Sequence, residues 1–359
     1  MRRMLWVLLL VALAACRPAP ASPPAATVAL PARLTPPAAT PAAEPLAVFF
    51  TAEHPGHGLR GGLDATVAAS IDAARLTVDA ALYDLNLWSI RDALIRAHRR
   101  GVQVRIVAES DHLDEKAFAA LQRADIPVVG DGRKALMHNK FIVIDRYMVW
   151  TGSMNYTLNG VYRNDNNLVR LVSPRIVADY TAEFEEMFRD HRFGADSPAN
   201  TPYPQVSLDG TPVEVYFAPE DHPLMHLLPI VRNARQSIAF MAFNLTDDDL
   251  ARLLLTKQRQ GVDVAGVCDA RQARTSKGND CRYLFRNGVD MRLDGNPYAM
   301  HHKVFVVDGE TVIFGSYNFT HSAETRNDEN LLIVHDPLLA ARFLQEFRRV
   351  YRQASEYNP

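Results

Sequence analysis

The sequence predicts a two-lobed α/β protein built by duplication, in which each lobe is an α/β/α sandwich around a mixed sheet. The main observation is a polar motif that occurs twice, in residues 137–167 and 300–330, with the same spacing inside each copy. Strand-like and helix-like segments also alternate in the same order before each copy. Finally, each half closes on an amphipathic helix whose aromatic residues keep the offset of the repeat. These observations predict one structural unit present twice.

Strands and helices are expected in the same order in the two halves. The first half contains predicted strands at 47–50, 76–83 and 102–107 and predicted helices at 62–74 and 87–100. The second half contains predicted strands at 213–217, 237–243 and 262–267 and a predicted helix at 250–260. A glycine follows one helix in each half, as is common at helix C termini. These glycines, Gly101 and Gly261, differ by 261 − 101 = 160, so the second half gained about three residues before its polar motif.

Each half is expected to end on a helix that buries aromatic residues. These residues are Tyr180, Phe184 and Phe188 in the first half and Phe343, Phe347 and Tyr351 in the second. The segment between the halves is rich in Pro, Asp, Ser and Gly, which indicates a linker. We therefore expect an N-terminal lobe at 47–195, a linker at 196–212 and a C-terminal lobe at 213–359.

The N-terminal residues indicate export. Arg2 and Arg3 precede an apolar run, residues 4–15, which has the length of a signal-peptide core and is too short to span a bilayer. The run ends in Leu-Ala-Ala-Cys and resembles the lipobox of bacterial lipoproteins, which implies removal of residues 1–15 and lipid attachment to Cys16. An ordinary signal peptide with an incidental cysteine is the alternative. Residues 17–46, mostly Pro, Ala, Thr and Ser, predict a disordered tether. We expect a lipoprotein anchored to a bacterial membrane and facing the periplasm or the cell exterior.

The remaining cysteines and the charge set further bounds. Cys268 and Cys281 are either joined in a disulfide, which export permits, or two separate buried thiols. The formal net charge of −2 shows no global basic field of the kind that nucleic-acid-binding proteins display. This weakens the hypothesis of a nuclease, although a local basic cleft is compatible with a neutral total.

The repeated motif places polar side chains on buried strands. Residues two apart share one face of a strand, so His138 points with Lys140, and His301 points with Lys303. A hairpin turn follows each pair, at Asp145 and at Asp308. The returning strands end in Gly-Ser-x-Asn, which brings Asn155 and Asn318 beside the histidine–lysine pairs. The candidate catalytic residues are three pairs separated by 163 residues: His138, Lys140, Asn155, His301, Lys303 and Asn318.

These side chains suit a phosphodiester substrate. The lysines and asparagines can neutralise and hydrogen-bond the non-bridging phosphate oxygens, which gain charge in the transition state. One imidazole can attack phosphorus while the other protonates the leaving oxygen. Two-fold symmetry would place the imidazoles on opposite sides of the phosphate, as an in-line displacement requires.

Both copies resemble the signature of the phospholipase D superfamily, H-x-K-x4-D-x6-G-S-x-N, and match it in full. The matching residues are His138, Lys140, Asp145, Gly152, Ser153, Asn155, His301, Lys303, Asp308, Gly315, Ser316 and Asn318. The resemblance extends from about residue 47 to the C terminus. It implies a two-lobed phospholipase D-like fold, a covalent phosphohistidine intermediate, and no metal or other cofactor. Asp145, Asp308, Ser153 and Ser316 are expected to support the site rather than to react.

The copies differ 28 residues after the histidine, where the first has Asn166 and the second has Glu329. In relatives, a polar residue here hydrogen-bonds an active-site imidazole. We expect Glu329 beside His301, where a carboxylate would favour the protonated imidazole of a general acid. Asn166 would then leave His138 neutral, as a nucleophile must be.

The leading hypothesis is a hydrolase of phospholipase D type that cleaves phospholipids near its membrane anchor. An endonuclease is the first alternative, because Arg133, Lys134 and Arg163 flank the first motif and could contact a nucleic acid backbone. Transfer of a phosphatidyl group to an alcohol is a second, and a non-catalytic envelope binding module is a remote third. One chain holds both half-sites, so a monomer is expected to be sufficient.

Overall fold

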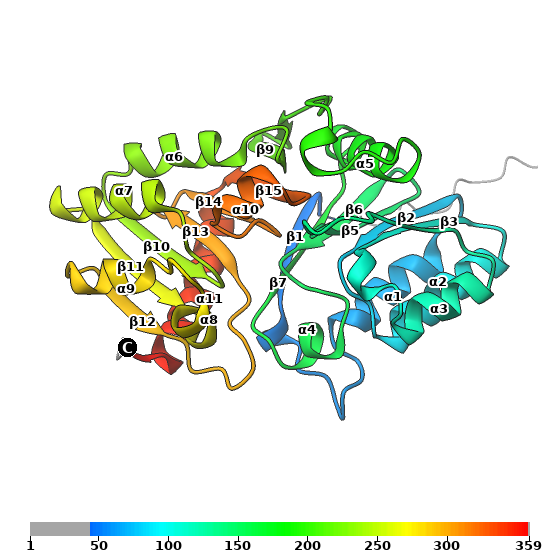
Figure 1. Ribbon diagram of the computed structural model, residues 1–359, viewed down its shortest axis with the longest axis horizontal. Helices are drawn as coiled ribbons and strands as arrows, with labels where there is room; N and C mark the ends of the chain where they lie inside the picture. The colour runs from blue at the N-terminus through cyan, green and yellow to red at the C-terminus, as the bar shows by residue number, and fades with distance from the viewer. Residues whose placement is uncertain (1–43, 358–359) are drawn as a thin grey trace, which may run out of the picture. The chain divides into compact units, whose positions relative to one another are not determined.

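The structure, a computed structural model, describes residues 44–357. The predicted signal peptide, the lipidation site at Cys16 and tether residues 17–43 lie outside the described residues. Among residues 44–357, every helix is too short or too polar to cross a membrane. The described residues form two lobes, each built on one mixed sheet (Figure 1), so the predicted duplicated fold is confirmed.

The N-terminal lobe has a seven-stranded sheet in the order β1-β7-β6-β5-β2-β3-β4. Its strands are β1 Leu46–Phe50, β2 Thr77–Leu82, β3 Gln103–Ala108, β4 Val128–Gly130, β5 Lys140–Ile144, β6 Met148–Gly152 and β7 Asn167–Leu171. Its helices are η1 Thr51–Glu53, α1 Leu63–Ala73, α2 Trp88–Arg99, η2 Ser110–His112, α3 Lys116–Arg123, α4 Leu158–Tyr162 and α5 Pro174–Phe188. Strands β2, β3 and β4 are parallel and the other pairs are antiparallel.

The C-terminal lobe has a nine-stranded sheet in the order β16-β12-β11-β10-β13-β14-β15-β9-β8. Its strands are β8 Gln205–Leu208, β9 Thr211–Ala218, β10 Ser237–Ala242, β11 Asp263–Cys268, β12 Asp290–Leu293, β13 Lys303–Val307, β14 Thr311–Gly315, β15 Glu329–His335 and β16 Ser355–Glu356. Its helices are α6 Pro223–Asn233, α7 Asp248–Arg259, α8 Ala270–Thr275, α9 Cys281–Arg286, α10 His321–Thr325 and α11 Pro337–Gln353. From β9 to β12 the strand order repeats that of the first sheet, with β8 and β16 added at the edges.

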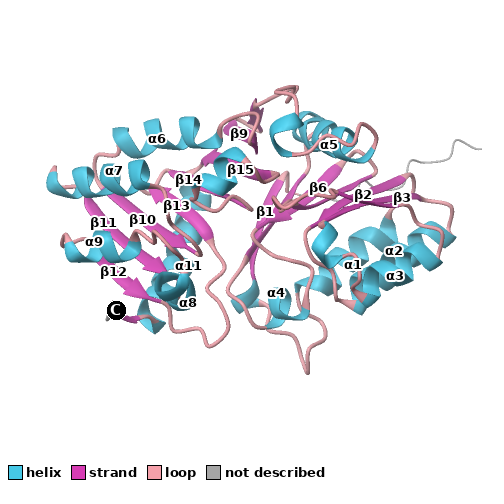
Figure 2. Ribbon diagram, viewed as in Figure 1, coloured by secondary structure: helices cyan, strands magenta, loops and turns pink. Residues whose placement is uncertain are grey.

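Helices cover both faces of each sheet (Figure 2). One apolar core lies under α1, α2 and α3 in the N-terminal lobe, and a second lies under α6, α7 and α9 in the C-terminal lobe. A third core is shared by the two lobes and contains the aromatic residues of α5 and α11, including Phe184 and Phe343. The shared core explains why the closing helices are apolar on one side and why the lobes pack as one unit.

The segment that we expected to be a linker contains strand structure. The 3-10 helix η3, Gly194–Asp196, begins the connection, and β8 lies within 196–212 and pairs with β9. Val206 and Leu208 alternate with exposed residues and join the shared core. Asp209 and Gly210 form the turn with positive φ angles, which explains the polar, glycine-containing composition that suggested a linker.

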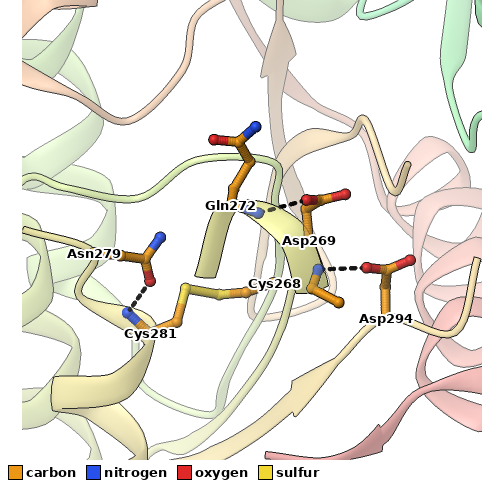
Figure 3. Close-up of a disulfide and its surroundings, with 7 residues drawn as sticks. Cys268, Asp269, Gln272, Asn279, Cys281 and Asp294 are labelled. Atoms are coloured by element: carbon orange, nitrogen blue, oxygen red, sulfur yellow. Dashed lines mark hydrogen bonds between the residues drawn. A yellow bond between two sulfur atoms is a disulfide. The ribbon is translucent and has the colours of Figure 1, made fainter. Parts of the chain in front are cut away.

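A disulfide joins Cys268 at the end of β11 to Cys281 at the start of α9, with the Cα atoms 6.5 Å apart (Figure 3). Of the two possibilities left open by the sequence, the structure therefore has the bridged form. The next residue, Asp269, caps α8 through the N–H of Gln272 and also accepts the N–H of Met300 at 3.2 Å. The disulfide thus anchors Cys268, the residue before Asp269, and the Asp269 carboxylate in turn holds Met300, the residue before His301.

Candidate active site

Each polar motif enters its sheet immediately before a buried central strand. His138 lies just before β5 and His301 just before β13, while Lys140 and Lys303 are the first residues of those strands. All four side chains are at least nine-tenths buried. They lie at the junction of the two lobes, because the segments before β5 and β13 each pair with the other lobe.

Two short parallel bridges cross between the lobes at this point. Met137 pairs with Asp328, and Met300 pairs with Asp165. The N–H of His138 donates to the carbonyl of Asp328, and the N–H of His301 donates to the carbonyl of Asp165, both at 2.9 Å. The residue that follows each aspartate therefore faces the histidine of the opposite lobe.

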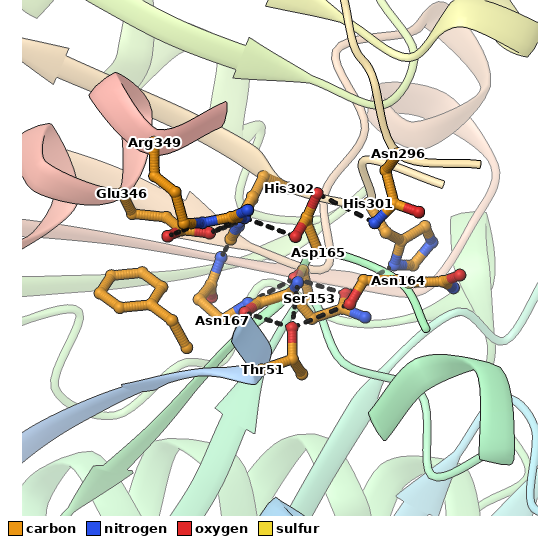
Figure 4. A network of polar contacts seen from close by, with 12 residues as sticks. Thr51, Ser153, Asn164, Asp165, Asn167, Asn296, His301, His302, Glu346 and Arg349 are labelled. Carbon is orange, nitrogen blue, oxygen red and sulfur yellow. Dashed lines mark hydrogen bonds and ion pairs between the residues drawn. The ribbon is translucent and has the colours of Figure 1, made fainter. Parts of the chain in front are cut away.

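This crossing overturns one expectation. Glu329 does not lie beside His301, because its Oε2 is 2.7 Å from Nδ1 of His138. Asn166 is the residue beside His301, with Oδ1 2.9 Å from Nδ1 (Figure 4 shows His301 next to the segment that contains Asn164, Asp165 and Asn167). We expected Glu329 to raise the pKa of His301 and so to make it the general acid. That reason is wrong, because Glu329 contacts His138.

The two serines orient these partners. Ser153 Oγ donates to Asn166 Oδ1 at 2.9 Å, and Ser316 Oγ donates to Glu329 Oε2 at 2.7 Å. The N–H groups of Asn167 and Asn330 donate to the same hydroxyls. Each serine thus contacts the residue that holds a histidine, and its supporting role in the reaction stays a prediction.

The glycine before each serine is required by close backbone packing. A Cβ on Gly152 would lie 2.6 Å from the carbonyl oxygen of Asn167, and a Cβ on Gly315 would lie 2.2 Å from that of Asn330. Any side chain here would push the returning strand away from the segment that carries Asn166 or Glu329. The glycines therefore set the spacing that lets the serines reach their acceptors.

The lysines point back along their strands toward the histidines. Lys140 Nζ donates to the carbonyl of His138 at 2.5 Å, and Lys303 Nζ donates to that of His301 at 2.9 Å. An aromatic ring lies against each pair, Tyr83 in the N-terminal lobe and Phe243 in the C-terminal lobe. These rings are an unpredicted part of the site. The sequence could have indicated them, because an aromatic residue directly follows both β2 and β10.

The remaining motif residues divide into two kinds. Asn155 and Asn318 each have a buried Oδ1 that makes no hydrogen bond to another described residue, so each amide oxygen can accept a hydrogen bond from an O–H or N–H group of a ligand. The aspartates lie away from the imidazoles. Asp145 accepts the N–H groups of residues 75–77, and Asp308 accepts those of residues 235–237. They tie each hairpin to the residues that lead into its neighbouring strand.

The tautomers of both histidines follow from their partners. Burial alone would raise the pKa of Glu329, but His138, Lys140 and Ser316 lower it by more. The net pKa lies below the ordinary value, so Glu329 is ionised. A carboxylate only accepts, so Nδ1 of His138 carries the proton. Asn166 donates Nδ2 to the carbonyl of Gly160 at 2.8 Å, which turns Oδ1 toward His301 and makes that Nδ1 a donor as well. In both neutral imidazoles, Nε2 is left with a free lone pair.

Burial and nearby positive charges lower the pKa values of the histidines and lysines in the ligand-free site. Burial is the main cause that lowers the pKa of His138 to about 4, against the opposing effect of Glu329. Burial and then the two lysines hold the pKa of His301 well below its ordinary value. The pKa of Lys140 is lowered to about 7 by burial, and that of Lys303 is also well below its usual range. An anionic ligand would reverse these shifts by supplying the missing negative charge.

A second layer of buried polar residues was not predicted. The residue between each histidine and lysine, Asn139 or His302, bonds to a glutamate on a closing helix, Glu183 at 2.7 Å or Glu346 at 3.1 Å. His302 also accepts from Asn167, and it faces away from the reacting groups, as its place on the opposite strand face predicted. The sequence could have indicated the two glutamates, because they differ by the offset of the repeat, 346 − 183 = 163.

Two groups of side chains among the described residues could hold a metal ion. One is Asp84, His112 and Glu115, and the other is Glu183, Glu186 and Glu220. Neither contains a histidine or lysine of the repeated motif. The expectation of a metal-free reaction stays a prediction.

Comparison with known proteins identifies the relatives of this chain. Residues 67–188 and 227–351 match the family described as "Cardiolipin synthase, PLD-like domain". The mitochondrial cardiolipin hydrolase of Chlamydomonas reinhardtii is 28% identical over 199 residues, 49% of this chain and 88% of that protein. The phospholipase D of Rickettsia bellii is 30% identical over 155 residues, 42% of this chain and 77% of that protein. The phosphatidylserine synthase of Haemophilus influenzae has a TM-score of 0.68 over 88% of this chain and 87% of its own, with 14% identity, and so shares the fold.

Proposed function

The chain belongs to the phospholipase D superfamily, and on this premise we propose that it hydrolyses phospholipid phosphodiesters through a phosphohistidine intermediate. The observation that carries the proposal is the pair of imidazoles at the lobe junction. Each has Nδ1 held as a donor, by Glu329 or by Asn166, so that each presents a free Nε2. Lys140 and Lys303 supply positive charge for the phosphate between them.

His138 is the nucleophile in this proposal, for a reason other than the one expected from the sequence. Phosphorylation at Nε2 leaves the imidazole ring positively charged while Nδ1 keeps its proton. The carboxylate of Glu329, 2.7 Å from Nδ1, stabilises that charge directly. Asn166 offers His301 only a neutral acceptor, which suits a group that must gain and lose a proton in each cycle.

The two steps balance in bonds and protons. Nε2 of His138 forms a bond to phosphorus as the bond to the leaving oxygen breaks, and protonated His301 gives its Nε2 proton to that oxygen. In the second step neutral His301 takes a proton from water, whose oxygen attacks phosphorus and releases His138. The substrate phosphate raises the lowered pKa of His301 on binding, which allows the first step to begin with a protonated imidazole.

Phospholipid is the substrate class that we favour. The relatives include a phospholipase D and a cardiolipin hydrolase, by their names. The lipobox-like sequence at Cys16 adds a second argument, because a lipid anchor would keep the enzyme on a membrane surface. We therefore propose an exported, lipid-anchored enzyme that faces the periplasm or the cell exterior and is active as a monomer.

A nuclease is the main alternative, and the structure removes part of its support. Arg133, one of three basic residues that flank the first motif, forms ion pairs with Asp131 and Asp328. Arg163 lies over the ring of Tyr298 and donates to Asn159. Only Lys134 of the three is exposed. Transfer of the phosphatidyl group to an alcohol uses the same intermediate and differs only in what attacks it.

The substrate assay compares phospholipid vesicles with single- and double-stranded DNA, in the presence of a chelator and at a temperature well below unfolding. We expect turnover of the vesicles with release of the headgroup, and we expect His138→Ala to abolish it. Hydrolysis of DNA alone, with a steep loss of rate as salt increases, would establish the nuclease instead. Added ethanol would reveal the transferase by formation of phosphatidylethanol.

The order of the two histidines is tested by trapping the intermediate. Acid-sensitive, base-stable phosphate from labelled substrate should accumulate on His138 when His301→Ala slows the second step. Mapping of the label to His301 in a His138→Ala variant, with none on His138 in the reciprocal variant, would reverse the assignment.

A further inference from the structure

Three glutamates converge between the lobes at a place that the proposed reaction does not use. Glu183 and Glu186 lie on α5, and Glu220 follows β9. One carboxylate oxygen of each lies within 4.8 Å of the others. Glu183 and Glu186 are 3% and 4% exposed, so water cannot screen their mutual repulsion.

Two of the three carboxylates have unused buried oxygens. Glu186 Oε1 and Glu220 Oε2 make no hydrogen bond among the described residues, whereas Glu183 Oε1 accepts Nδ2 of Asn139 at 2.7 Å. Ser197 Oγ, next to Glu186, is also buried and makes no hydrogen bond of regular geometry. The cluster therefore offers three buried oxygen atoms, Glu186 Oε1, Glu220 Oε2 and Ser197 Oγ, as available metal ligands.

The internal repeat shows what is missing from this cluster. By the 163-residue offset, Glu183 corresponds to Glu346 and Glu186 corresponds to Arg349. In the C-terminal lobe the Arg349 guanidinium lies 2.7 Å from Glu346 and also pairs with Asp165. In the N-terminal lobe a glutamate replaces this arginine and Glu220 adds another carboxylate. A resident cation in one lobe thus corresponds to a cluster of acids in the other.

The charged residues near the cluster do not supply the positive charge that the arginine provides in the other lobe. Asp221 and Asp328 lie close enough to oppose ionisation of the cluster, and Arg192 is the neighbouring cation that favours it. Arg133, the other cation nearby, already pairs with Asp131 and Asp328.

We propose that Glu183, Glu186 and Glu220 bind one divalent cation that joins α5 to the segment after β9. Hard cations take oxygen ligands, and calcium–oxygen distances of roughly 2.3–2.6 Å allow opposite ligands to lie about 5 Å apart, which the cluster satisfies. Calcium tolerates irregular geometry better than magnesium, so it is the first candidate. Glu220 also lines a cavity of about 370 Å³, which gives the ion an entry path and room for water ligands. The ion would hold the lobes together and take no part in the chemistry at His138.

The test measures calcium and magnesium binding to chelator-treated protein by equilibrium dialysis, with thermal unfolding in parallel. We expect one ion per chain and a rise in Tm of roughly 5 °C at a hundred-fold excess over Kd. Glu186→Gln and Glu220→Gln should each weaken binding at least ten-fold. Glu310→Gln, which removes an exposed carboxylate from the β13–β14 turn, should leave binding unchanged.

A further variant restores the residue found in the other lobe. Glu186→Arg should bind no ion, and its Tm should be unaffected by chelator and at least equal to that of ion-free wild type. Two results would overturn the proposal. One is that wild type binds neither ion at millimolar concentration, which would show that the three carboxylates are not a cation site. The other is that both glutamine variants keep wild-type binding, which would place the ion elsewhere.

Discussion

At the scale of single residues, the partner of Nδ1 is the difference between the two histidines that changes the charge beside the ring. His138 has a carboxylate and His301 has an amide, although both motifs match the same signature. A serine holds each partner, so the asymmetry lies in the charge and not in the geometry. We infer that this one difference in charge separates the nucleophile from the acid.

Replacing Glu329 tests that inference. Glu329→Gln keeps the size of the side chain but removes the charge that stabilises a phosphorylated His138, so kcat should fall on the order of a hundred-fold or more. Asn166→Ala should also slow turnover, because it frees His301 to rotate. The measurement is steady-state hydrolysis of a chromogenic phosphodiester, with Glu310→Gln as the matched control. Wild-type kcat in Glu329→Gln would contradict the role given to the carboxylate.

The lowered pKa of His138 predicts a stability that depends on pH. In the unfolded chain the His138 imidazole binds a proton below its ordinary pKa of about 6.5, whereas in the folded chain it does so only below about pH 4. Acid therefore favours unfolding across that window, and His138 alone should account for about 3 kcal/mol. The measurement compares the free energy of unfolding of wild type and His138→Asn from pH 4 to pH 6.5. Wild type should gain relative to the variant as the pH rises, and a constant difference would refute the shift.

At the scale of elements, the motif aspartates are hairpin supports. Each accepts three consecutive backbone N–H groups from the residues that lead into the neighbouring antiparallel strand, β2 or β10. Burial raises the pKa of Asp308, but these donors lower it more, so its net pKa lies below the ordinary value. The turn and the strand are thereby held in one register.

Asp308→Ala should lower the free energy of unfolding by about 1–2 kcal/mol, because three N–H groups exchange a charged acceptor for water. The effect on kcat should stay within a few-fold. Urea unfolding and steady-state kinetics on the same preparation separate the two effects, and Asp145→Ala provides the corresponding test in the other lobe. Full loss of turnover with unchanged stability would show that the aspartate acts in the reaction.

At the scale of the whole described unit, the two lobes are joined through the site. The segments before β5 and β13 each pair with the opposite lobe, and buried aspartates beside them form ion pairs with Arg133 and Arg349. The shared apolar core adds α5 and α11 to the same interface. The lobes therefore hold the imidazoles in position, and each lobe contributes one partner to the histidine of the other.

Removing one of these arginines should destabilise the junction. Arg133→Ala leaves Asp328, whose side chain is 1% exposed, without its cation. Burial already raises the pKa of Asp328 to about 7, so the carboxyl can take up a proton, and the expected loss is about 1–3 kcal/mol. Asp328→Asn in the same chain should recover part of that loss by removing the buried charge. Arg189→Ala, which breaks an exposed pair with Asp190, should leave the free energy of unfolding close to that of wild type, because solvent screens such a pair. An equal, small effect of both arginine variants would argue against the interface role.

The sequence alone determined the duplicated fold and the identity of the paired motif residues. Strand and helix patterns are local properties, and a fixed offset of 163 reports two copies whatever their arrangement in space. The strand β8 was hidden within a predicted linker, because its turn residues dominate a short segment with only two buried side chains.

Only the tertiary structure decided which partner each histidine has. Spacing along the chain connects Glu329 to His301, but two backbone bridges exchange the partners between lobes and place Glu329 on His138. The same holds for the glutamate cluster, whose third member comes from another lobe. Pairing across a pseudo-two-fold junction leaves no signal in local periodicity, because it depends on how the shared core docks the lobes.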